Sequence, residues 1–284
     1  MTGTRGGRRA WQLPQGVSAG TWDYVAEPSI ATEYDAYHGD HPLMRLDVQL
    51  LREHLRNYPT DPMGALARQP CVADFGCGTG RIGRMIEPLG YRVLNIDLSS
   101  HMLRQVQSQT RQSERSSCVQ SNLVELEWLA EKSIDVAVCL FSSIGMIRGR
   151  PNRRRFLEHV RRSLRPGGGL LLHVHNRGHS WRDPHGPAWL ISTAWKRFCK
   201  TGWEFGDRVY SYRGLPSMFL HIYSQSELRG DLRAAGFMTP DITPIHLTGR
   251  SLISKRSPLL YLRAGGFFAW ASAEGTWQQH GRTT

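Results

Sequence analysis

Three glycines at alternate positions, preceded by an acid, form the pattern with the most specific chemistry in this sequence. Asp74 is followed by Gly76, Gly78 and Gly80, between a buried-strand pattern and a helical pattern that begins at Arg81. Glycines lack Cβ, so the backbone can turn tightly and approach a ligand, and the first amides of the following helix point at the same place. The pattern predicts a loop that holds a nucleoside-bearing ligand.

The same loop also matches a second pattern. Residues 78–83 (Gly-Thr-Gly-Arg-Ile-Gly) satisfy G-x-G-x-x-G, the fingerprint of dinucleotide-binding folds. A dinucleotide would bring its pyrophosphate to the end of the strand, where the carboxylate of Asp74 would repel it. The acid therefore favours a ligand that has no phosphate and carries positive charge.

A second acid ends the next predicted strand. Residues 92–97 read as a buried strand that closes with Asp97, 21 residues after Gly76. A carboxylate at this position can accept hydrogen bonds from both hydroxyls of a ribose. Ser99 or Ser100 can cap the helix that follows.

Strand and helix patterns alternate through most of the chain. The predicted strands are 71–75, 92–97, 118–120, 133–141, 169–175 and two more near 241–247 and 262–272; the predicted helices lie within 30–55 and at 81–89, after Asp97, and at 123–129, 152–164 and 225–235. Such alternation is typical of a parallel sheet with right-handed crossovers. We predict an α/β fold with a doubly wound, seven-stranded, mostly parallel sheet.

A long connection, from about residue 177 to residue 224, follows the fifth predicted strand. It is rich in aromatic residues: Trp181, Trp189, Trp195, Phe198, Trp203, Phe205, Tyr210, Tyr212, Phe219 and Tyr223. Loops at the carboxyl ends of parallel strands form the ligand crevice of such folds, so we predict a lid insertion over an acceptor pocket, or a small satellite core, which is compatible with it. Residues 1–20 read as a disordered basic tail and residues 21–284 as a single domain.

Together these segments resemble the class I S-adenosylmethionine-dependent methyltransferases with a type 11/25-like domain. The resemblance covers residues 30–272 and rests on Asp74-x-Gly76-x-Gly78-x-Gly80, on Asp97-Leu98-Ser99-Ser100, and on the turn Arg165-Pro166-Gly167-Gly168 before the fifth strand. It implies a Rossmann-like fold and S-adenosylmethionine as cofactor. The cofactor-binding residues that it implies are Tyr34, Asp74, Phe75, Gly76, Cys77, Gly78, Gly80, Asp97, Leu98, Asn122, Leu123 and Phe141.

One position departs from the family pattern. After the third strand, the family commonly has an acid that accepts a hydrogen bond from the adenine N6 amine, whereas this chain has Asn122. An asparagine can still accept through its amide oxygen. Tyr34 belongs to an N-terminal element that in the family often closes over the cofactor.

Two histidines on the fifth predicted strand are candidates for proton transfer. Strand alternation places His173 and His175 on one face, with His175 nearest the carboxyl end and the crevice. We predict His175 as a catalytic base, with a hydrogen-bonded structural histidine as the alternative, and we expect the structural role for His173. His221 and Tyr223 are further candidates.

Composition gives weaker indications. The formal net charge is +12, and arginines gather in residues 148–165, which reads either as a solvated helix face or as a nucleic-acid surface. Five cysteines without a C-x-x-C pair indicate reduced thiols and no metal site. No apolar run approaches the ~20 residues of a membrane helix and no signal peptide is apparent, so we expect a cytoplasmic protein without a membrane partner.

The leading functional hypothesis is methyl transfer from S-adenosylmethionine to a small-molecule acceptor by in-line displacement. The alternatives are a tRNA methyltransferase of the wobble-uridine type, because of the basic charge, and a non-catalytic module that binds the cofactor or RNA. Hydride transfer by a nicotinamide enzyme ranks last.

Overall fold

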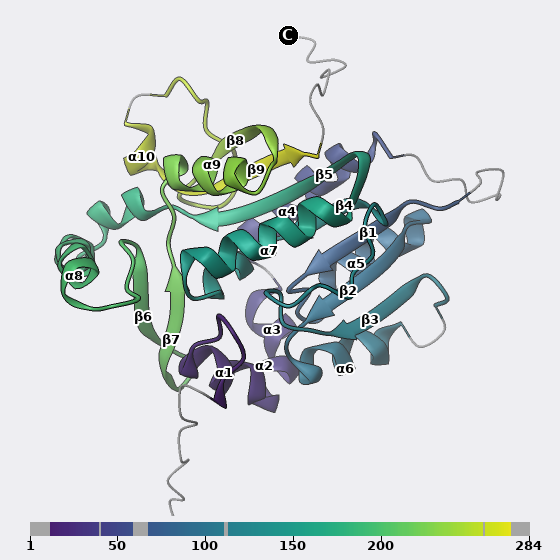
Figure 1. Cartoon of the computed structure of the whole chain (residues 1–284), viewed down its shortest axis with the longest axis horizontal. Coiled ribbons are helices and arrows are strands. Elements are labelled where there is room, and N and C mark those ends of the chain that lie inside the picture. Colours follow the sequence, from purple (N-terminus) through teal and green to yellow (C-terminus); the bar gives the residue numbers. More distant parts are fainter. Residues whose placement is uncertain (1–11, 40, 59–67, 111–112, 258, 274–284) are drawn as a thin grey trace, which may run out of the picture.

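The central element is a sheet of seven strands in the order β3-β2-β1-β4-β5-β9-β8. The computed structural model describes residues 12–39, 41–58, 68–110, 113–257 and 259–273 (Figure 1). The strands of this sheet are β1 Cys71–Phe75, β2 Arg92–Asp97, β3 Ser116–Gln120, β4 Ile134–Cys139, β5 Leu164–His175, β8 Met238–His246 and β9 Ala264–Ser272. The first five strands pair in parallel, and β9 runs antiparallel to both of its neighbours, β5 and β8. The predicted seven-stranded, mostly parallel sheet is confirmed.

Helices cover both faces of this sheet. Figure 1 shows α7 (Arg150–Ser163) in front of the sheet and α4 (Pro42–Leu55) behind it. On the front face, α7 and α9 (Gln225–Ala234) pack their apolar residues against β1, β4, β5 and β9. On the other face, α4 and α5 (Arg81–Ile86) pack against the same central strands and β2. The result is a three-layer, doubly wound architecture.

The central strands show why the sheet is buried on both sides. In β1, Val72 points into the cluster under α4, whereas Ala73 and Phe75 point into the cluster under α7. Every residue of β4 is buried. A run of apolar residues without polar alternation is what a parallel strand between two helix layers requires.

The sequence order of the strands reverses between β1 and β4. In doubly wound folds, a crevice opens at such a switch point, outside the carboxyl ends of the strands. The segments that leave β1, β2, β4 and β5 therefore meet there. The helix α6 (Ser100–Gln109) begins at the end of β2, and the side chain of Ser99 caps it by accepting from the amide of Met102, as predicted.

Two local predictions were wrong. The predicted helix 123–129 is a pair of turns, in which the amide of Glu125 donates to Asn122 O and the amide of Leu129 donates to Leu126 O. Leu123, Leu126 and Leu129 are buried in these successive chain turns. Their spacing of three residues resembles the spacing of buried residues in a helix. The predicted disordered tail is residues 1–20; residues 1–11 lie outside the described residues, but residues 12–20 have a defined path that includes the start of α1 (Ala19–Ala26).

Three short helices follow this N-terminal path, namely α1, α2 (Pro28–Thr32) and α3 (Tyr34–His38). Hydrogen bonds tie the path to the segments that follow β3 and β4. The amide of Arg148 donates to Gly16 O at 2.7 Å, and Asn122 Nδ2 donates to Gln15 O at 3.0 Å. The predicted break at residues 41–42 is confirmed, because α4 starts at Pro42.

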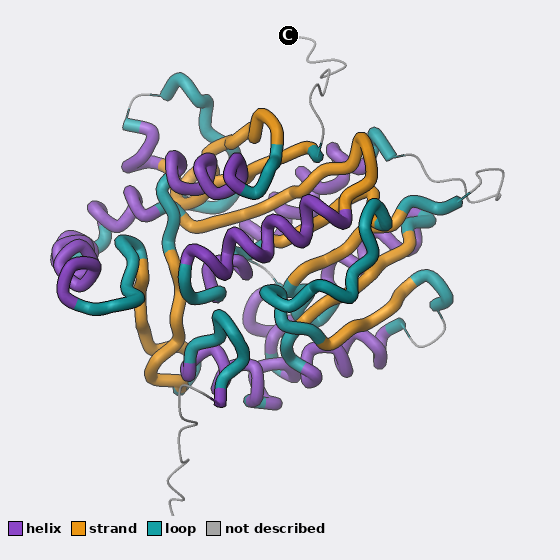
Figure 2. Tube along the Cα trace, in the orientation of Figure 1, coloured by secondary structure: helices purple, strands orange, loops and turns teal. Residues whose placement is uncertain are grey.

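The predicted lid region has regular structure of its own. It contains the short 3₁₀-helix η4 (Arg177–Arg182), the helix α8 (Gly186–Cys199), and a hairpin formed by β6 (Asp207–Tyr212) and β7 (Leu215–His221). Figures 1 and 2 show the hairpin and α8 beside the sheet, with α1 against the free end of the hairpin. The hairpin is a separate two-stranded sheet, so the insertion is an added layer and not one long loop.

The arginines of α7 have a role that the sequence did not indicate. Arg153 is fully buried, and its Nη2 lies 2.6 Å from Glu204 Oε2. Arg150 and Arg154 both pair with the buried carboxylate of Asp231 on α9, at 2.6 and 2.8 Å. These side chains hold α7 to α9 and to the loop before β6, which makes them neither a free solvated face nor a free nucleic-acid surface.

We expect Arg153→Met to lower the free energy of unfolding by about 3 kcal/mol. The reason is that the carboxylate of Glu204 would lose its ion-pair partner, the buried guanidinium of Arg153. Urea denaturation measures this change. The matched control is Arg148→Met, since Arg148 is an exposed arginine of the same segment, and its replacement should cost less than about 0.5 kcal/mol. Equal effects of the two substitutions would contradict this assignment.

Candidate functional site

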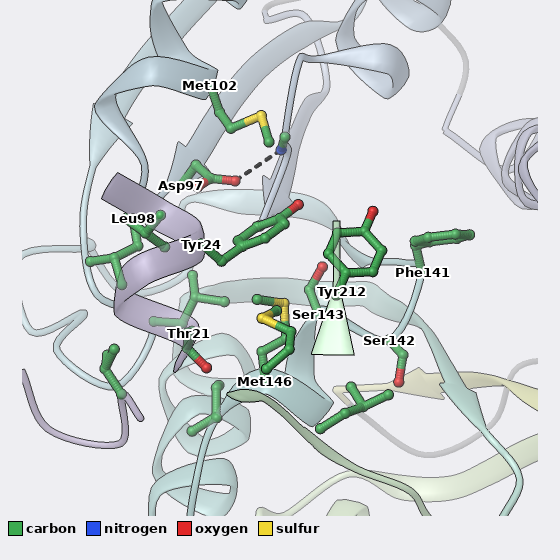
Figure 3. A pocket seen from close by; sticks show the side chains of 18 of the residues that line it. Thr21, Tyr24, Asp97, Leu98, Met102, Phe141, Ser142, Ser143, Met146 and Tyr212 are labelled. Atoms are coloured by element: carbon green, nitrogen blue, oxygen red, sulfur yellow. Dashed lines mark hydrogen bonds between the residues drawn. The ribbon is translucent and has the colours of Figure 1, made fainter. Parts of the chain in front are cut away.

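A cavity lies at the carboxyl ends of β1, β2, β4 and β5. Residues from the glycine loop, from the ends of these strands, from the N-terminal helices and from the β6–β7 hairpin line it. Figure 3 shows Asp97 and Met102 at one end, Phe141 and Ser142 at the other, and Tyr24 and Tyr212 between them. The cavity therefore combines the strand ends of a doubly wound fold with a cover from the N-terminal helices and the hairpin.

The loop after β1 is shaped by its glycines. Gly76, Gly78 and Gly80 have φ of 74°, 56° and 78°, in the left-handed region that glycine adopts without strain. A Cβ on Gly76 would also lie 2.8 Å from Cβ of Ser143, so a larger residue would collide with the segment after β4. Gly76 and Gly78 both line the cavity.

Asp97 fixes this loop to the end of β2. Its Oδ2 accepts from the amide of Gly78 at 2.9 Å, and its Oδ1 accepts from the amide of Ser99 at 2.8 Å. Burial raises the pKa of Asp97, and the backbone amides that donate to it oppose this shift. Each carboxylate oxygen keeps a lone pair beyond the one that the backbone uses, so the group can still accept from a ligand.

The backbone after β4 is strained at the cavity wall. Phe141 and Ser142 have φ of 53° and 64°, which non-glycine residues rarely adopt. Both residues line the cavity, and the amide of Ser142 donates to His173 O at 3.2 Å on the neighbouring β5. Strain of this kind persists only where the surroundings hold it, and such positions cluster at functional sites.

Aromatic side chains form the cover of the cavity. Nε2 of His38 and the hydroxyl of Tyr212 are 2.8 Å apart, which joins α3 to the hairpin. The ring centroids of Tyr24 and Tyr212 are 6.0 Å apart, and those of Tyr34 and His38 are 4.7 Å apart. Burial raises the pKa of Tyr24 and Tyr34, so these phenols stay neutral.

His175 lines the cavity at the end of β5, as the sequence predicted. Burial lowers the pKa of its imidazole to about 4, and the neighbouring His41 and His179 act in the same direction. The ring is therefore neutral at physiological pH and can accept a hydrogen bond. His173 is buried behind it, and burial lowers the pKa of its imidazole well below the usual value.

Asp74 lies below the glycine loop and outside the cavity wall. Its carboxyl is buried, and this burial raises its pKa to about 7. Arg81 at the start of α5 is the main opposing influence on that pKa. The guanidinium of Arg81 also binds the buried Asp47, at 3.3 Å from Asp47 Oδ2, and donates to Met44 O, so it ties α5 to α4. Asp74 is thus not among the residues that line the cavity, and its part in cofactor binding stays a prediction.

Eight of the twelve residues predicted to bind the cofactor line the cavity: Tyr34, Gly76, Gly78, Asp97, Leu98, Asn122, Leu123 and Phe141. The other four lie outside its wall: Asp74, Phe75, Cys77 and Gly80. Phe75 points into the core and packs edge-on against Phe156, with ring centroids 5.5 Å apart. Cys77 packs against Leu103 and Val106 of α6, and a Cβ on Gly80 would meet Val106, which explains the need for glycine there.

Sequence reasoning missed much of the cover. The residues that it did not name are Gly16, Val17, Thr21, Tyr24, Val25, His38, Met146, Ile147, Met218 and Leu220, while Tyr210 and Tyr212 were named only as part of the lid. A usable signal existed for some of them. Thr21, Tyr24 and Val25 share one face of a helix whose N-cap, Ser18, is a standard start signal.

His221, the other candidate from the lid region, has a structural role. Its imidazole lies between Asp207 and Glu227, at 2.7 and 2.9 Å. In the described part of the chain, His221, Glu204 and Glu227 are the one cluster whose ligand atoms are spaced for a metal ion. Because Arg153 and Arg177 already pair with these two glutamates, the cluster is best described as an ion-pair network. Tyr223 is fully buried beside it and lines no part of the cavity.

The sequence is similar to methyltransferases. Residues 72–168 match the family model of a methyltransferase domain. Over 181 residues, 61% of this chain, it is 30% identical to the ubiquinone biosynthesis O-methyltransferase of Paraburkholderia phymatum and covers 67% of that protein. It is 29% identical over 105 residues, 37% of this chain, to the putative methyltransferase YqeM of Bacillus subtilis, and 29% identical over 140 residues, 48% of this chain, to the human thiol S-methyltransferase TMT1B. The alignments with the last two relatives span only 42% and 52% of their lengths.

Solved structures share the fold. A Methanosarcina mazei methyltransferase aligns with a TM-score of 0.56 at 20% identity, over 77% of this chain and 95% of that one. A Burkholderia thailandensis 1,6-didemethyltoxoflavin N1-methyltransferase aligns with a TM-score of 0.53 at 19% identity, over 92% of both chains. Identity that extends over two thirds of a methyltransferase, together with this fold, establishes the family, and the chain belongs to the class I S-adenosylmethionine-dependent methyltransferases.

Proposed function

We propose that this protein transfers the methyl group of S-adenosylmethionine to a small-molecule acceptor by in-line displacement. The observation that carries the proposal is the composition of the cavity described above. One end has the glycine loop and Asp97, and the rest is walled by aromatic and apolar side chains from α1 and the hairpin. A nucleoside with a cationic centre and an apolar acceptor would find matching surfaces there.

The residues present fit the cofactor. Asp97 has lone pairs free to accept from the two ribose hydroxyls, and Gly76 and Gly78 leave room for close approach of the backbone. Tyr24, Tyr34 and Tyr212 are neutral rings whose faces attract a cation such as a sulfonium. When bound, the cofactor supplies an electrophilic methyl group. Asp74 contributes from below, because a buried carboxyl gains from positive charge nearby.

Asn122 has a smaller share in binding than the resemblance implies. Its Oδ1 already accepts from the amide of Val124 at 3.2 Å, and its Nδ2 donates to Gln15 O. One lone pair of Oδ1 stays available for the adenine amine. We propose that Asn122 mainly fixes the N-terminal path over the adenine end, and that Leu98 and Leu123 supply apolar contacts to the base.

The acceptor end is apolar. Val17, Met146, Ile147, Met218 and Leu220 line the cavity together with Tyr210, and we propose that the acceptor lies against such side chains. Such a wall aligns a flat or apolar acceptor and excludes water, and orientation alone can contribute about 7 kcal/mol or more to a displacement. His175 borders this region, and we propose that it accepts a hydrogen bond, and then the proton, from an acceptor hydroxyl. A pKa of about 4 makes it a weak base, so its contribution should be smaller than that of alignment.

A tRNA substrate has less support. The arginines that suggested nucleic-acid binding include Arg150, Arg153 and Arg154, whose guanidinium groups pair with Asp231 and Glu204. Paired side chains are not free to neutralise phosphates. The names of the Paraburkholderia and Burkholderia relatives refer to ubiquinone biosynthesis and to a toxoflavin precursor, which are small molecules.

The direct test is a methyl-transfer assay with isotopically labelled S-adenosylmethionine and cell extract separated into metabolites and RNA. We expect the label to enter the metabolite fraction, and transfer to change little with added salt, because no phosphate contacts are involved. Label that enters RNA and falls steeply with salt would favour the tRNA methyltransferase. Cofactor binding without any transfer would favour the non-catalytic module.

We expect Asp97→Ala to weaken the affinity for S-adenosylmethionine by at least about tenfold, because both the ribose contact and the anchor of the glycine loop are lost. Calorimetric titration of the purified full chain measures this affinity. Asp23→Ala, at an exposed aspartate of α1, serves as the control and should bind normally. Normal cofactor binding by Asp97→Ala would refute the placement of the ribose.

We expect His175→Ala to lower kcat by roughly ten- to a hundredfold with unchanged cofactor affinity, if the acceptor reacts through a hydroxyl. The ratio of wild-type to variant kcat should stay constant from about pH 5.5 to 8, because an imidazole with a pKa of about 4 remains neutral throughout this range. His246→Ala, at the end of β8, is the control. A ratio that rises through pH 6.5 would show an imidazole that titrates normally.

A further inference from the structure

Helix α8 presents large apolar side chains to solvent along one line. Ile191, Trp195 and Phe198 are 69%, 70% and 83% exposed. Their spacing of four and three residues places them on one face of the helix, and Trp181 in the adjoining η4 is also 58% exposed. We call Ile191, Trp195 and Phe198 the outer stripe of α8.

The opposite face of α8 is anchored to the hairpin. Leu190 and Thr193 are buried, and the hydroxyl of Thr193 and the indole nitrogen of Trp189 contact Asp207 O at 3.2 and 3.3 Å. The helix is therefore held in one orientation, with its outer stripe directed away from the protein. Figure 1 shows α8 at the edge of the molecule, beyond β6.

Helix α8 and the turn that follows it carry charges of one sign. Residues 186–203 contain Lys196, Arg197 and Lys200 and no Asp or Glu. Lys196 Nζ and Lys200 Nζ lie 5.0 and 6.0 Å from the ring centroid of Trp203, next to the end of the helix. Trp and Phe on one face with Lys and Arg at its border are the composition of helices that lie in the headgroup region of a bilayer.

We propose that the outer stripe of α8 binds the surface of an anionic phospholipid bilayer. The apolar side chains enter the boundary between headgroups and acyl chains, and the three cations face the phosphate and carboxylate groups of the lipids. This is peripheral binding. None of the helices in the described ranges combines the length and the apolar character that crossing a membrane requires. The proposal concerns a surface outside the cavity and does not depend on the proposed acceptor.

The charge pattern favours a bilayer over a second copy of the chain. The protein has a formal net charge of +12, so two copies that met through a basic face would repel each other. Interfaces between proteins are also depleted of lysine, whereas the stripe has two lysines at its border. An anionic lipid surface satisfies both the apolar and the cationic side chains.

The test is co-sedimentation of the full chain with vesicles of phosphatidylcholine and phosphatidylserine, and with vesicles of phosphatidylcholine alone. We expect binding to the anionic vesicles that is at least about tenfold tighter and that weakens with added salt. The double variant Trp195→Ser/Phe198→Ser should lose at least about tenfold of this binding. Lys196→Gln/Lys200→Gln should reduce the salt-dependent part.

The matched control is Trp128→Ser, which removes a tryptophan that is 46% exposed in the turns before β4. It should bind vesicles like the wild type. Thermal unfolding and calorimetric titration of S-adenosylmethionine should be unchanged in the α8 variants, because the replaced side chains point to solvent and line no part of the cavity.

Three outcomes would overturn the proposal. In the first, the wild type does not bind anionic vesicles. In the second, the Trp195→Ser/Phe198→Ser variant binds them as tightly as the wild type, which would assign the binding to another basic segment. In the third, sedimentation analysis finds a wild-type dimer that the same variant converts to a monomer, and the stripe then joins two copies of the chain.

Discussion

The carboxylate of Asp97 is the contact on which the arrangement of the site depends. Through Gly78 it fixes the glycine loop, and through Ser99 it fixes the first turn of α6. The hydroxyl of Ser99 donates to Val25 O at 2.9 Å, which brings the end of α1 over the same point. One acid at the end of β2 thus joins the loop to the helix, Ser99 joins both to the N-terminal cover, and Asp97 also lines the cavity. A ligand that binds Asp97 therefore binds a position that the backbone has already defined.

The sequence was sufficient for the parts of the site that are local. The glycine loop, Asp97 and the end of β4 follow directly from a strand and its adjoining turn, so spacing along the chain places them without knowledge of the tertiary fold. The same holds for the sheet, because buried strands and amphipathic helices alternate regularly. His175 followed from simple alternation on β5. Each of these features depends on the sequence of a few neighbouring residues.

The cover and the interior charges could not be predicted in this way. Tyr24 and Tyr212 meet only because α1 packs against the hairpin, and no pattern within either segment specifies that contact. Arg153 looks like any exposed arginine until Glu204, 51 residues later, is placed beside it. The burial of Asp74, and the influence of Arg81 and Asp47 on its pKa, likewise depend on the packing of α4 and α5 against β1. Contacts between distant segments decided each of these cases.

The distribution of charge follows from the same contacts. A net charge of +12 disfavours a cationic cofactor, yet the wall of the cavity has Asp97 and aromatic rings, and the buried Asp74 lies outside this wall. Several arginines of α7 form ion pairs with Asp231, Glu204 and Glu127, so nearby carboxylates balance their positive charge. The cations bordering the outer stripe of α8 lie on the outer edge of the insertion. No Lys or Arg is among the described residues that line the cavity, so the side chains in its wall leave room for a cationic ligand in a basic chain.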